Sequence, residues 1–367
     1  MTEFFNHLKA SVDFDDKDRK NAWSVLESFG FPTRKWDAFK YVSLNKLDGM
    51  DYGQIHDEVY SSHDSQISLD YKQAEKEYSG LIKKSYSMLL SKETNPFVLL
   101  NAALYKAGRF IYIAPRRNEE VDFEFEPNGG MRMPKIEIYV GKDACCTLKI
   151  KLNGIGKYFF NSLLNVTIEE GGQLIIKEHY ENSVDAIVMN SIRGTIKTNG
   201  KVFLESFSTG GRCERHDIAF NLAGEGSFVD LKGLSLPKDI KEIHHFITIN
   251  HLVENTSSSQ HYKSAIMDYA NASFEGKIYV EKKAQKTSAY QLNNNLLLST
   301  KAKARSKPNL EIYADDVKAS HGATMSKVDK DALFYLRSRG LSINSAKKEL
   351  TRGFCKELFN VENIDKY

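Results

Sequence analysis

Cysteine is scarce in this chain: it has four in 367 residues, at positions 145, 146, 213 and 355. They form neither a disulfide framework nor the short spacings of a zinc site, which excludes a small disulfide-stabilised fold and favours a reducing compartment. No run approaches the ~18 apolar residues of a membrane-spanning helix. The first residues carry acids and no basic head before an apolar run, so we expect no signal or transit peptide and a cytoplasmic protein.

An excess of charge of either sign is also missing. The chain has 51 Lys and Arg against 48 Asp and Glu, a formal net charge of +3, which gives no support to nucleic acid as a partner. The densest basic run, 301–307, is expected to be a solvated loop. The phosphate-loop pattern GxxxxGK[ST] is absent as well, so we expect no ATPase activity from this chain.

The helical period of apolar residues predicts a mainly helical N-terminal domain over residues 1–115. One helix is predicted over 18–29 and ends at Gly30, where a left-handed residue closes the last turn. A second is predicted over 70–90, and a third begins at Pro96 and ends at Gly108. The apolar face of the first helix comprises Ala22, Val25, Leu26 and Phe29.

After Arg109 the apolar residues alternate with polar ones, which is the period of a β-strand. The alternating segments are 110–114, 121–125, 135–140 and 147–152. Further on, glycines open strands at Gly172, Gly200, Gly226 and Gly276, separated by 28, 26 and 50 residues. A strand–turn unit that recurs at about this spacing predicts a solenoid of stacked rungs over 116–328. An antiparallel sandwich remains the alternative.

The most polar part of the predicted solenoid is 242–273. Its four histidines, His244, His245, His251 and His261, raise the question of a metal site. Their spacing mixes strand faces and no Cys or Glu completes a compact set, so outward-facing or hydrogen-bonded histidines are favoured. Among the cysteines, Cys213 lies nearest to basic residues and has the local charge most favourable to a thiolate.

A helical segment is predicted over 329–367. Asp329 or Asp331 starts a helix that ends at Gly340, and Ser342 caps a second. The apolar stripe of the second helix comprises Ile343, Ala346, Leu350, Phe354 and Leu358. This stripe either docks a partner or packs on the end of the solenoid.

The stretch 308–322, PNLEIYADDVKASHG, joins a strand-like run, an acidic pair and a lone histidine. With AYQLNNNLLLS before it, LFYLRSRG after it and FPTRKWDAFKYVSL near the N-terminus, it closely resembles the SufB/SufD family of the SUF iron–sulfur cluster assembly system. The motif EIYADDVKxSHGAT is of the SufD type. The thiol and carboxylate of SufB-like chains are replaced by Leu292 and Gly322, whereas the segment around Cys355 is similar to SufB.

The resemblance implies a mainly β fold, a right-handed parallel β-helix with flanking helices. It also implies a scaffold subunit that pairs with a SufB-like subunit and docks a SufC-like ATPase on its C-terminal helices. His321 would be a ligand of iron or of a nascent, transient cluster, since imidazole binds iron and moves protons near neutral pH. The family allows a flavin in the complex, and no cofactor is expected in the isolated chain.

The resemblance further implies two contact sets. The partner-interface set comprises Glu311, Tyr313, Asp315, Asp316, Lys318 and His321. The ATPase-docking set comprises Phe334, Tyr335, Arg337, Arg339, Gly340 and Phe354.

Two other functions stay open on the residues alone. One is a secreted-type β-helix polysaccharide lyase or hydrolase that uses Asp315 and Asp316. Adjacent strand residues point to opposite faces, which disfavours a facing acid pair. The other is a structural homodimer joined through 311–321.

Overall fold

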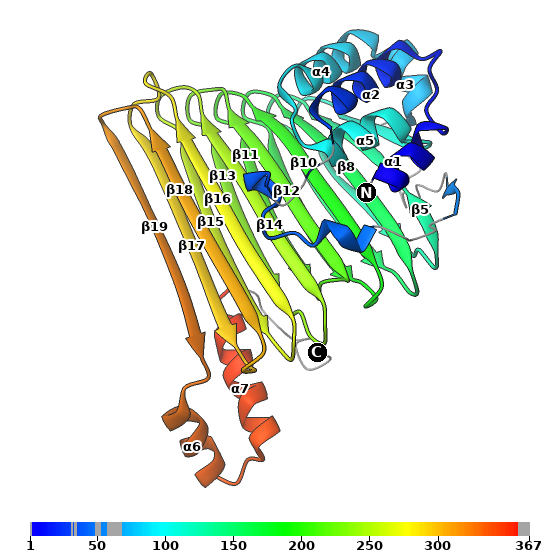
Figure 1. Cartoon of the computed structure of the whole chain (residues 1–367). Coiled ribbons are helices and arrows are strands. Elements are labelled where there is room, and N and C mark those ends of the chain that lie inside the picture. Colours follow the sequence, from blue (N-terminus) through cyan, green and yellow to red (C-terminus); the bar gives the residue numbers. More distant parts are fainter. Residues whose placement is uncertain (1, 31, 33–34, 48–52, 57–67, 359–367) are drawn as a thin grey trace.

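The computed structural model describes residues 2–30, 32, 35–47, 53–56 and 68–358. Most of this part forms a parallel β-solenoid, with helices at its N- and C-terminal ends (Figure 1). The predicted fold class is therefore confirmed, and the parallel pairing excludes the antiparallel sandwich. Residues 359–367 of the predicted C-terminal segment lie outside the described residues. No helix in the described part is long and apolar enough to cross a membrane.

Helices dominate the N-terminal part, where the α-helices pack together at one end of the solenoid and the two 3-10 helices lie over the outer face of its first sheet (Figure 1). They are α1 (Thr2–Lys9), α2 (Lys17–Phe29), η1 (Asp37–Phe39), η2 (Leu44–Leu47), α3 (Tyr71–Glu77), α4 (Ser79–Lys92) and α5 (Pro96–Leu104). The Asp16 carboxylate caps α2 by accepting from the amides of Asp18 and Arg19, and Gly30 closes it with φ of 69°.

Three details of the helical prediction are wrong. The helix predicted over 70–90 is broken at Tyr78, whose φ of −118° and ψ of 27° separate α3 from α4. The third helix ends at Leu104 because Gly108 already begins the first solenoid strand. Phe29 is 45% exposed, whereas Trp23 is buried, so the buried face of α2 is rotated from the predicted one.

The solenoid is built from two sheets. The first contains the parallel strands β3 (Gly108–Ile113), β6 (Lys135–Val140), β8 (Tyr158–Ile168), β10 (Ile187–Ile196), β12 (Cys213–Leu222), β14 (Glu242–His251), β16 (Asn271–Val280) and β18 (Lys303–Ile312). The short strands β1 (Ile55–His56), β2 (Ser68–Asp70) and β5 (Gly130–Arg132) join it. The second contains β4 (Asn118–Phe125), β7 (Cys145–Asn153), β9 (Gln173–Glu181), β11 (Lys201–Ser208), β13 (Phe228–Ser235), β15 (Ser257–Ile266), β17 (Thr287–Leu297) and β19 (Val317–Lys327).

Apolar side chains stack in register between the two sheets. Ile192 of β10 pairs with Ile218 of β12, which pairs with Ile247 of β14, and all three are buried. Each such side chain contributes about 1.5–3 kcal/mol on burial. Because a rung cannot cover its own inner face, each rung depends on its neighbours for stability.

Two features of the predicted solenoid differ from the structure. Gly276 lies inside β16 instead of opening a strand. Close packing requires a glycine there, because a Cβ would lie 2.7 Å from the Gln291 side-chain nitrogen and 2.8 Å from the Phe274 ring. The basic run 301–307 is not a loop, since β18 begins at Lys303. As the last strand of its sheet, β18 leaves its charged side chains partly in solvent, so its composition resembles that of a loop.

Candidate functional site

The solenoid has one open end, formed by β18 and β19. In the described part of the chain β18 pairs only with β16 and β19 only with β17, so their outer backbone groups meet no further strand. Both strands lie at the extreme edge of the solenoid (Figure 1). An uncovered edge of this kind is a template for pairing with another chain.

His321 lies on β19 in the row of side chains that face the inside of the solenoid. Its register partner, Gln291, is buried in the rung below and is followed there by Gln260. Because side chains alternate along a strand, Val317 and Ala319 share this inner face with His321. His321 is nevertheless exposed, since no further rung covers it. The structure thus places an accessible imidazole at the mouth of the solenoid.

The other predicted interface residues do not converge on His321. Glu311 pairs with Lys277 at 2.8 Å, and this hydrogen bond lowers the pKa of the carboxyl group. Tyr313 is exposed and its ring lies 5.6 Å from that of Tyr279. Lys318 is exposed on the opposite face of β19 from His321.

The acidic pair Asp315–Asp316 lies in the turn between β18 and β19, and both side chains are exposed. The Asp316 amide donates to the Gln285 side chain and its carbonyl accepts from the Lys286 amide. These bonds tie the turn to the rung below, and the two carboxylates lie in a turn instead of on opposite sides of a cleft.

The C-terminal segment forms two helices beside this open end, α6 (Lys330–Ser338) and α7 (Ile343–Lys356) (Figure 1). Asp329 caps α6 and Ser342 caps α7, as predicted. Phe334 and Tyr335 are 74% and 56% exposed. The Arg339 guanidinium lies 5.2 Å from the Tyr335 ring centroid. They form an exposed aromatic and basic surface.

The helix α7 packs against the solenoid through residues near its C-terminal end. Cys355 is buried in a cluster with Leu234, Leu236 and Ala265. The Lys263 ammonium donates to the Phe354 carbonyl at 2.9 Å and lies 4.8 Å from the Phe354 ring. Of the predicted docking set, Phe354 is therefore turned toward the solenoid.

Comparison with known proteins shows to which family this chain belongs. The family model for the SUF system FeS cluster assembly SufBD core domain matches residues 123–354. This chain belongs to the SufBD family. The match runs from the first rungs to α7 and so includes His321 and the exposed aromatics of α6.

Several curated members of the family are similar to this chain. An iron–sulfur cluster assembly SufBD family protein of Synechocystis is 31% identical over 250 residues, covering 64% of this chain and 54% of that protein. SufD of Escherichia coli is 38% identical over 156 residues, covering 42% and 37%. Protein ABCI7, chloroplastic, of Arabidopsis thaliana is 30% identical over 229 residues, covering 61% and 45%. The chain spans about half the length of the curated relatives it matches.

Inside the SufBD solenoid lies a buried acid–histidine group that the sequence did not reveal. The His216 Nε2 atom lies 2.7 Å from the Glu214 carboxylate, and its Nδ1 atom lies 3.8 Å from that of Glu178. The His216 ring stacks between Tyr180 and His245, with centroids 5.2 Å away on each side. Burial opposes the charged imidazole, but Glu214 and Glu178 outweigh it and raise the pKa of His216. Glu214 is two residues from His216 on the same strand, whereas the spacing of the rungs brings Glu178, Tyr180 and His245 to it.

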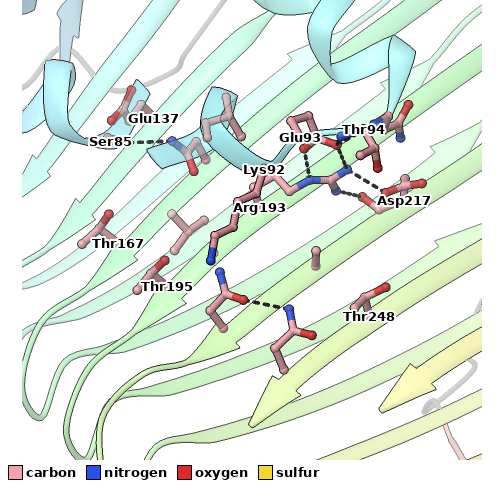
Figure 2. A pocket seen from close by; sticks show the side chains of 18 of the residues that line it. Ser85, Lys92, Glu93, Thr94, Glu137, Thr167, Arg193, Thr195, Asp217 and Thr248 are labelled. Atoms are coloured by element: carbon pink, nitrogen blue, oxygen red, sulfur yellow. Dashed lines mark hydrogen bonds and ion pairs between the residues drawn. The ribbon is translucent and has the colours of Figure 1, made fainter. Parts of the chain in front are cut away.

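A cavity of about 600 Å³ separates α4 from the outer face of β8, β10, β12 and β14. Its sheet side carries Thr167, Thr195 and Thr248 (Figure 2). At its rim, Arg193 lies between two buried carboxylates: Nε donates to Glu93 at 2.7 Å and Nη2 to Asp217 at 2.8 Å. This ion group joins the N-terminal helices to the SufBD core.

The histidine-rich segment differs from the prediction in one respect. Each of its four histidines has a hydrogen-bond partner, as expected. However, Cys213 and Glu242 do complete a compact set with His244, so the statement that no Cys or Glu does so is wrong. In the solenoid, Arg215 pairs with His244, 29 residues later, and this register brings Cys213 beside Glu242.

The basic neighbours that gave Cys213 the local charge most favourable to a thiolate do not lower the pKa of its thiol below the ordinary value. Burial, with a smaller effect of the Glu242 charge, raises the pKa of the Cys213 thiol to about 12. Of the two nearby arginines, Arg215 is already paired with Asp217 at 2.5 Å. Burial likewise raises the pKa of Cys355 to about 12, which disfavours the ionised form of this thiol near neutral pH.

Proposed function

We propose that this chain is a SufD-like scaffold subunit of a SUF iron–sulfur assembly complex, without ATPase activity of its own. The observation that carries the proposal is the open solenoid edge of a SufBD-family chain with an exposed imidazole in its inner row. An edge strand gains affinity by pairing its free N–H and C=O groups with a partner strand.

The partner proposed for this edge is a SufB-like subunit. This chain has Leu292 and Gly322 where the resemblance expects a thiol and a carboxylate. His321 can supply one neutral imidazole ligand, and the partner supplies the sulfur and oxygen ligands that iron also accepts. Iron or a nascent cluster is then held only in the complex, between the two subunits.

The exposed face of α6 is the proposed docking surface for a SufC-like ATPase. Phe334 and Tyr335 are largely exposed beside Arg337 and Arg339. Exposed aromatics with arginine are typical of the residues that carry binding energy in protein interfaces. The opposite helix, α7, fixes this surface to the solenoid.

Co-purification tests the proposal. An inward-pointing charge blocks an edge strand, so Ala323→Lys on the inner row of β19 is expected to abolish co-purification with a SufB-like subunit. Ser320→Lys adds the same charge on the opposite, exposed face and should retain pairing. His321→Ala should retain pairing but lose most of the iron of the co-purified complex. Both introduced lysines replace exposed residues, so the isolated variants should unfold like the native chain.

Other results would favour the alternatives. A homodimer that Ala323→Lys breaks, with no capture of a SufB-like subunit, would indicate a structural homodimer joined through this edge. Equal iron content in the native complex and in the His321→Ala complex would show that His321 is not an iron ligand. Turnover of an acidic polysaccharide by the isolated chain, abolished by Asp315→Asn, would support a carbohydrate enzyme instead.

A further inference from the structure

We propose that Cys213, Glu242 and His244 form a binding site for a thiophilic divalent metal ion of the Zn²⁺ or Fe²⁺ class. The site lies on the outer face of the first sheet, beneath the segment 37–47, and only β16 separates its strand β14 from the edge strand β18. It concerns the isolated chain and does not depend on the proposed function.

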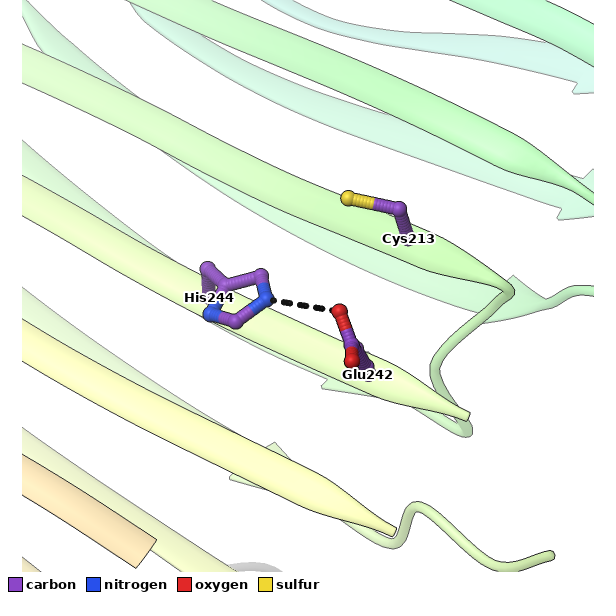
Figure 3. A group of neighbouring side chains, drawn as sticks. All are labelled: Cys213, Glu242 and His244. Carbon is purple, nitrogen blue, oxygen red and sulfur yellow. Dashed lines mark hydrogen bonds and ion pairs between the residues drawn. The ribbon is translucent and has the colours of Figure 1, made fainter. Parts of the chain in front are cut away.

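The β-strand register assembles the three donors. Cys213 begins β12, and Glu242 and His244 lie two residues apart on the neighbouring parallel strand β14, so all three share one face. One ligand atom from each lies within 4.8 Å of the others. Figure 3 shows the three side chains converging from the ends of the two strands.

Surrounding hydrogen bonds aim the donor atoms at one another. The His244 Nδ1 atom lies 2.8 Å from the Ser273 hydroxyl, which leaves Nε2 facing Glu242 Oε2 at 3.5 Å. The other carboxylate oxygen, Oε1, accepts from Ser43 at 3.2 Å and lies 3.0 Å from the Lys46 ammonium. Partners of this kind fix the orientation of metal ligands in known sites.

The donor chemistry decides the class of ion. A thiolate, an imidazole and a carboxylate suit Zn²⁺ or Fe²⁺, whereas Mg²⁺ and Ca²⁺ require oxygen donors. The thiol proton leaves as the sulfur–metal bond forms, so one thiolate and one carboxylate balance the charge of the ion. Three protein donors leave a fourth position open.

Positive charge near the site weakens metal binding but leaves a donor oxygen accessible. The Lys46 ammonium contacts Oε1 and also donates to the Arg212 carbonyl at 2.6 Å, so Oε2 stays available. The Arg215 guanidinium is neutralised by Asp217. Lys46 is the positive charge in direct contact with a donor group, so removing it should tighten metal binding.

Cobalt binding to the full-length chain tests the site. After anaerobic dialysis against Co²⁺, the native chain is expected to show a thiolate-to-cobalt charge-transfer band in the near ultraviolet, with one ion per chain. Cys213→Ser should abolish the band and weaken binding by more than about 100-fold, since loss of an outer partner alone costs about 10–100-fold. Cys145→Ser is the matched control, because Cys145 lies on β7 and outside the cluster.

Two further variants separate a metal site from a structural cluster. His244→Gln should weaken Co²⁺ binding without loss of the folded far-ultraviolet spectrum, and Lys46→Met should tighten it several-fold. Excess Zn²⁺ should displace the cobalt and raise the unfolding midpoint of the native chain but not of Cys213→Ser. A band that survives in Cys213→Ser, or the absence of any band in both the native chain and Lys46→Met, overturns the proposal.

Discussion

His251 and His216 both lie inside the solenoid, yet their surroundings shift their pKa values in opposite directions. Burial lowers the pKa of His251 to about 4, because its neighbours Thr256 and Ser258 offer hydroxyl groups and no opposite charge. Burial also opposes a charge on His216, but the hydrogen bond to Glu214 and the nearby carboxylates reverse the shift. The position of carboxylates, not burial alone, decides which histidine holds a proton.

His251→Gln should reduce the acid sensitivity of the chain. Between the folded pKa of about 4 and an unfolded value of about 6.5, the unfolded chain binds a proton that the folded chain does not. The free energy of unfolding of the native chain therefore falls as the pH falls through this window. From pH 7 to pH 5 the variant should lose about 2 kcal/mol less than the native chain. Urea unfolding at both pH values measures the difference.

The exposed His7→Gln is the control, and it should keep the native pH dependence. His216 does not confuse the comparison. Because the pKa of His216 is raised in the folded chain, its contribution to the free energy of unfolding is present below its unfolded pKa and is lost as the pH rises through its folded pKa. This contribution is the same in the native chain and in His251→Gln. An unchanged slope in His251→Gln would contradict the prediction.

At the scale of residues, the sequence predicted His321 by its motif but missed the Cys213 cluster. Nothing local joins Cys213 to His244, because their proximity depends on the register between rungs. That register follows from turn lengths, which vary along the chain, and composition does not specify it. Residues brought together by a solenoid become visible only once the rungs are aligned.

The helix α7 shows how one element can have two faces with different tasks. Ala346, Thr351 and Cys355 are its buried residues, whereas Ile343, at the start of the predicted stripe, is exposed. The apolar stripe thus packs on the solenoid in part, which was one of the two predicted roles. The helix pair is attached to the solenoid at Cys355, near the C-terminal end of α7.

Cys355→Ser should loosen α7 without unfolding the solenoid. A hydroxyl among Leu234, Leu236 and Ala265 has no partner in that cluster, and burying it costs about 1–3 kcal/mol. Local opening of the helix should become more frequent, because an element with few contacts opens independently of the core. Amide hydrogen exchange should rise across 343–356 and stay unchanged in β8, β10 and β12. Asn344→Ser, at an exposed position of the same helix, should leave exchange unchanged.

At the scale of elements, strands were easier to predict than their limits. The segment 135–140 coincides with β6, because alternation there is undisturbed. The helix predicted over 70–90 was continuous because nothing in its apolar spacing marks the break at Tyr78. The first half of the edge strand β18 was predicted as a loop, because a strand with one neighbour can carry charges that a central strand excludes.

The two ends of the whole molecule differ in how they are covered. The first rungs meet the N-terminal helices, and Asn101 of α5 donates to the carbonyls of Pro134 and Asn161 at 3.0 and 2.7 Å. The last rung has no such cover on β18 and β19 within the described part of the chain. A solenoid capped at one end and open at the other has one direction in which it can add a partner without breaking its own contacts.

The attachment of the capped end can be tested at Arg193. Its guanidinium is shared between Glu93, before α5, and Asp217 of β12, whose side chains are only 7% and 8% exposed. Arg193→Gln would leave the buried Glu93 carboxylate without its cation, whereas Asp217 would keep Arg215. Breaking a buried ion pair in this way costs about 3–5 kcal/mol. We expect urea to release the N-terminal helices first, as a separate phase in the unfolding of the variant. Lys142→Gln, which breaks the exposed pair with Glu170, should cost less than about 1 kcal/mol. Equal effects of the two substitutions would show that the Arg193 group does not hold the helices to the solenoid.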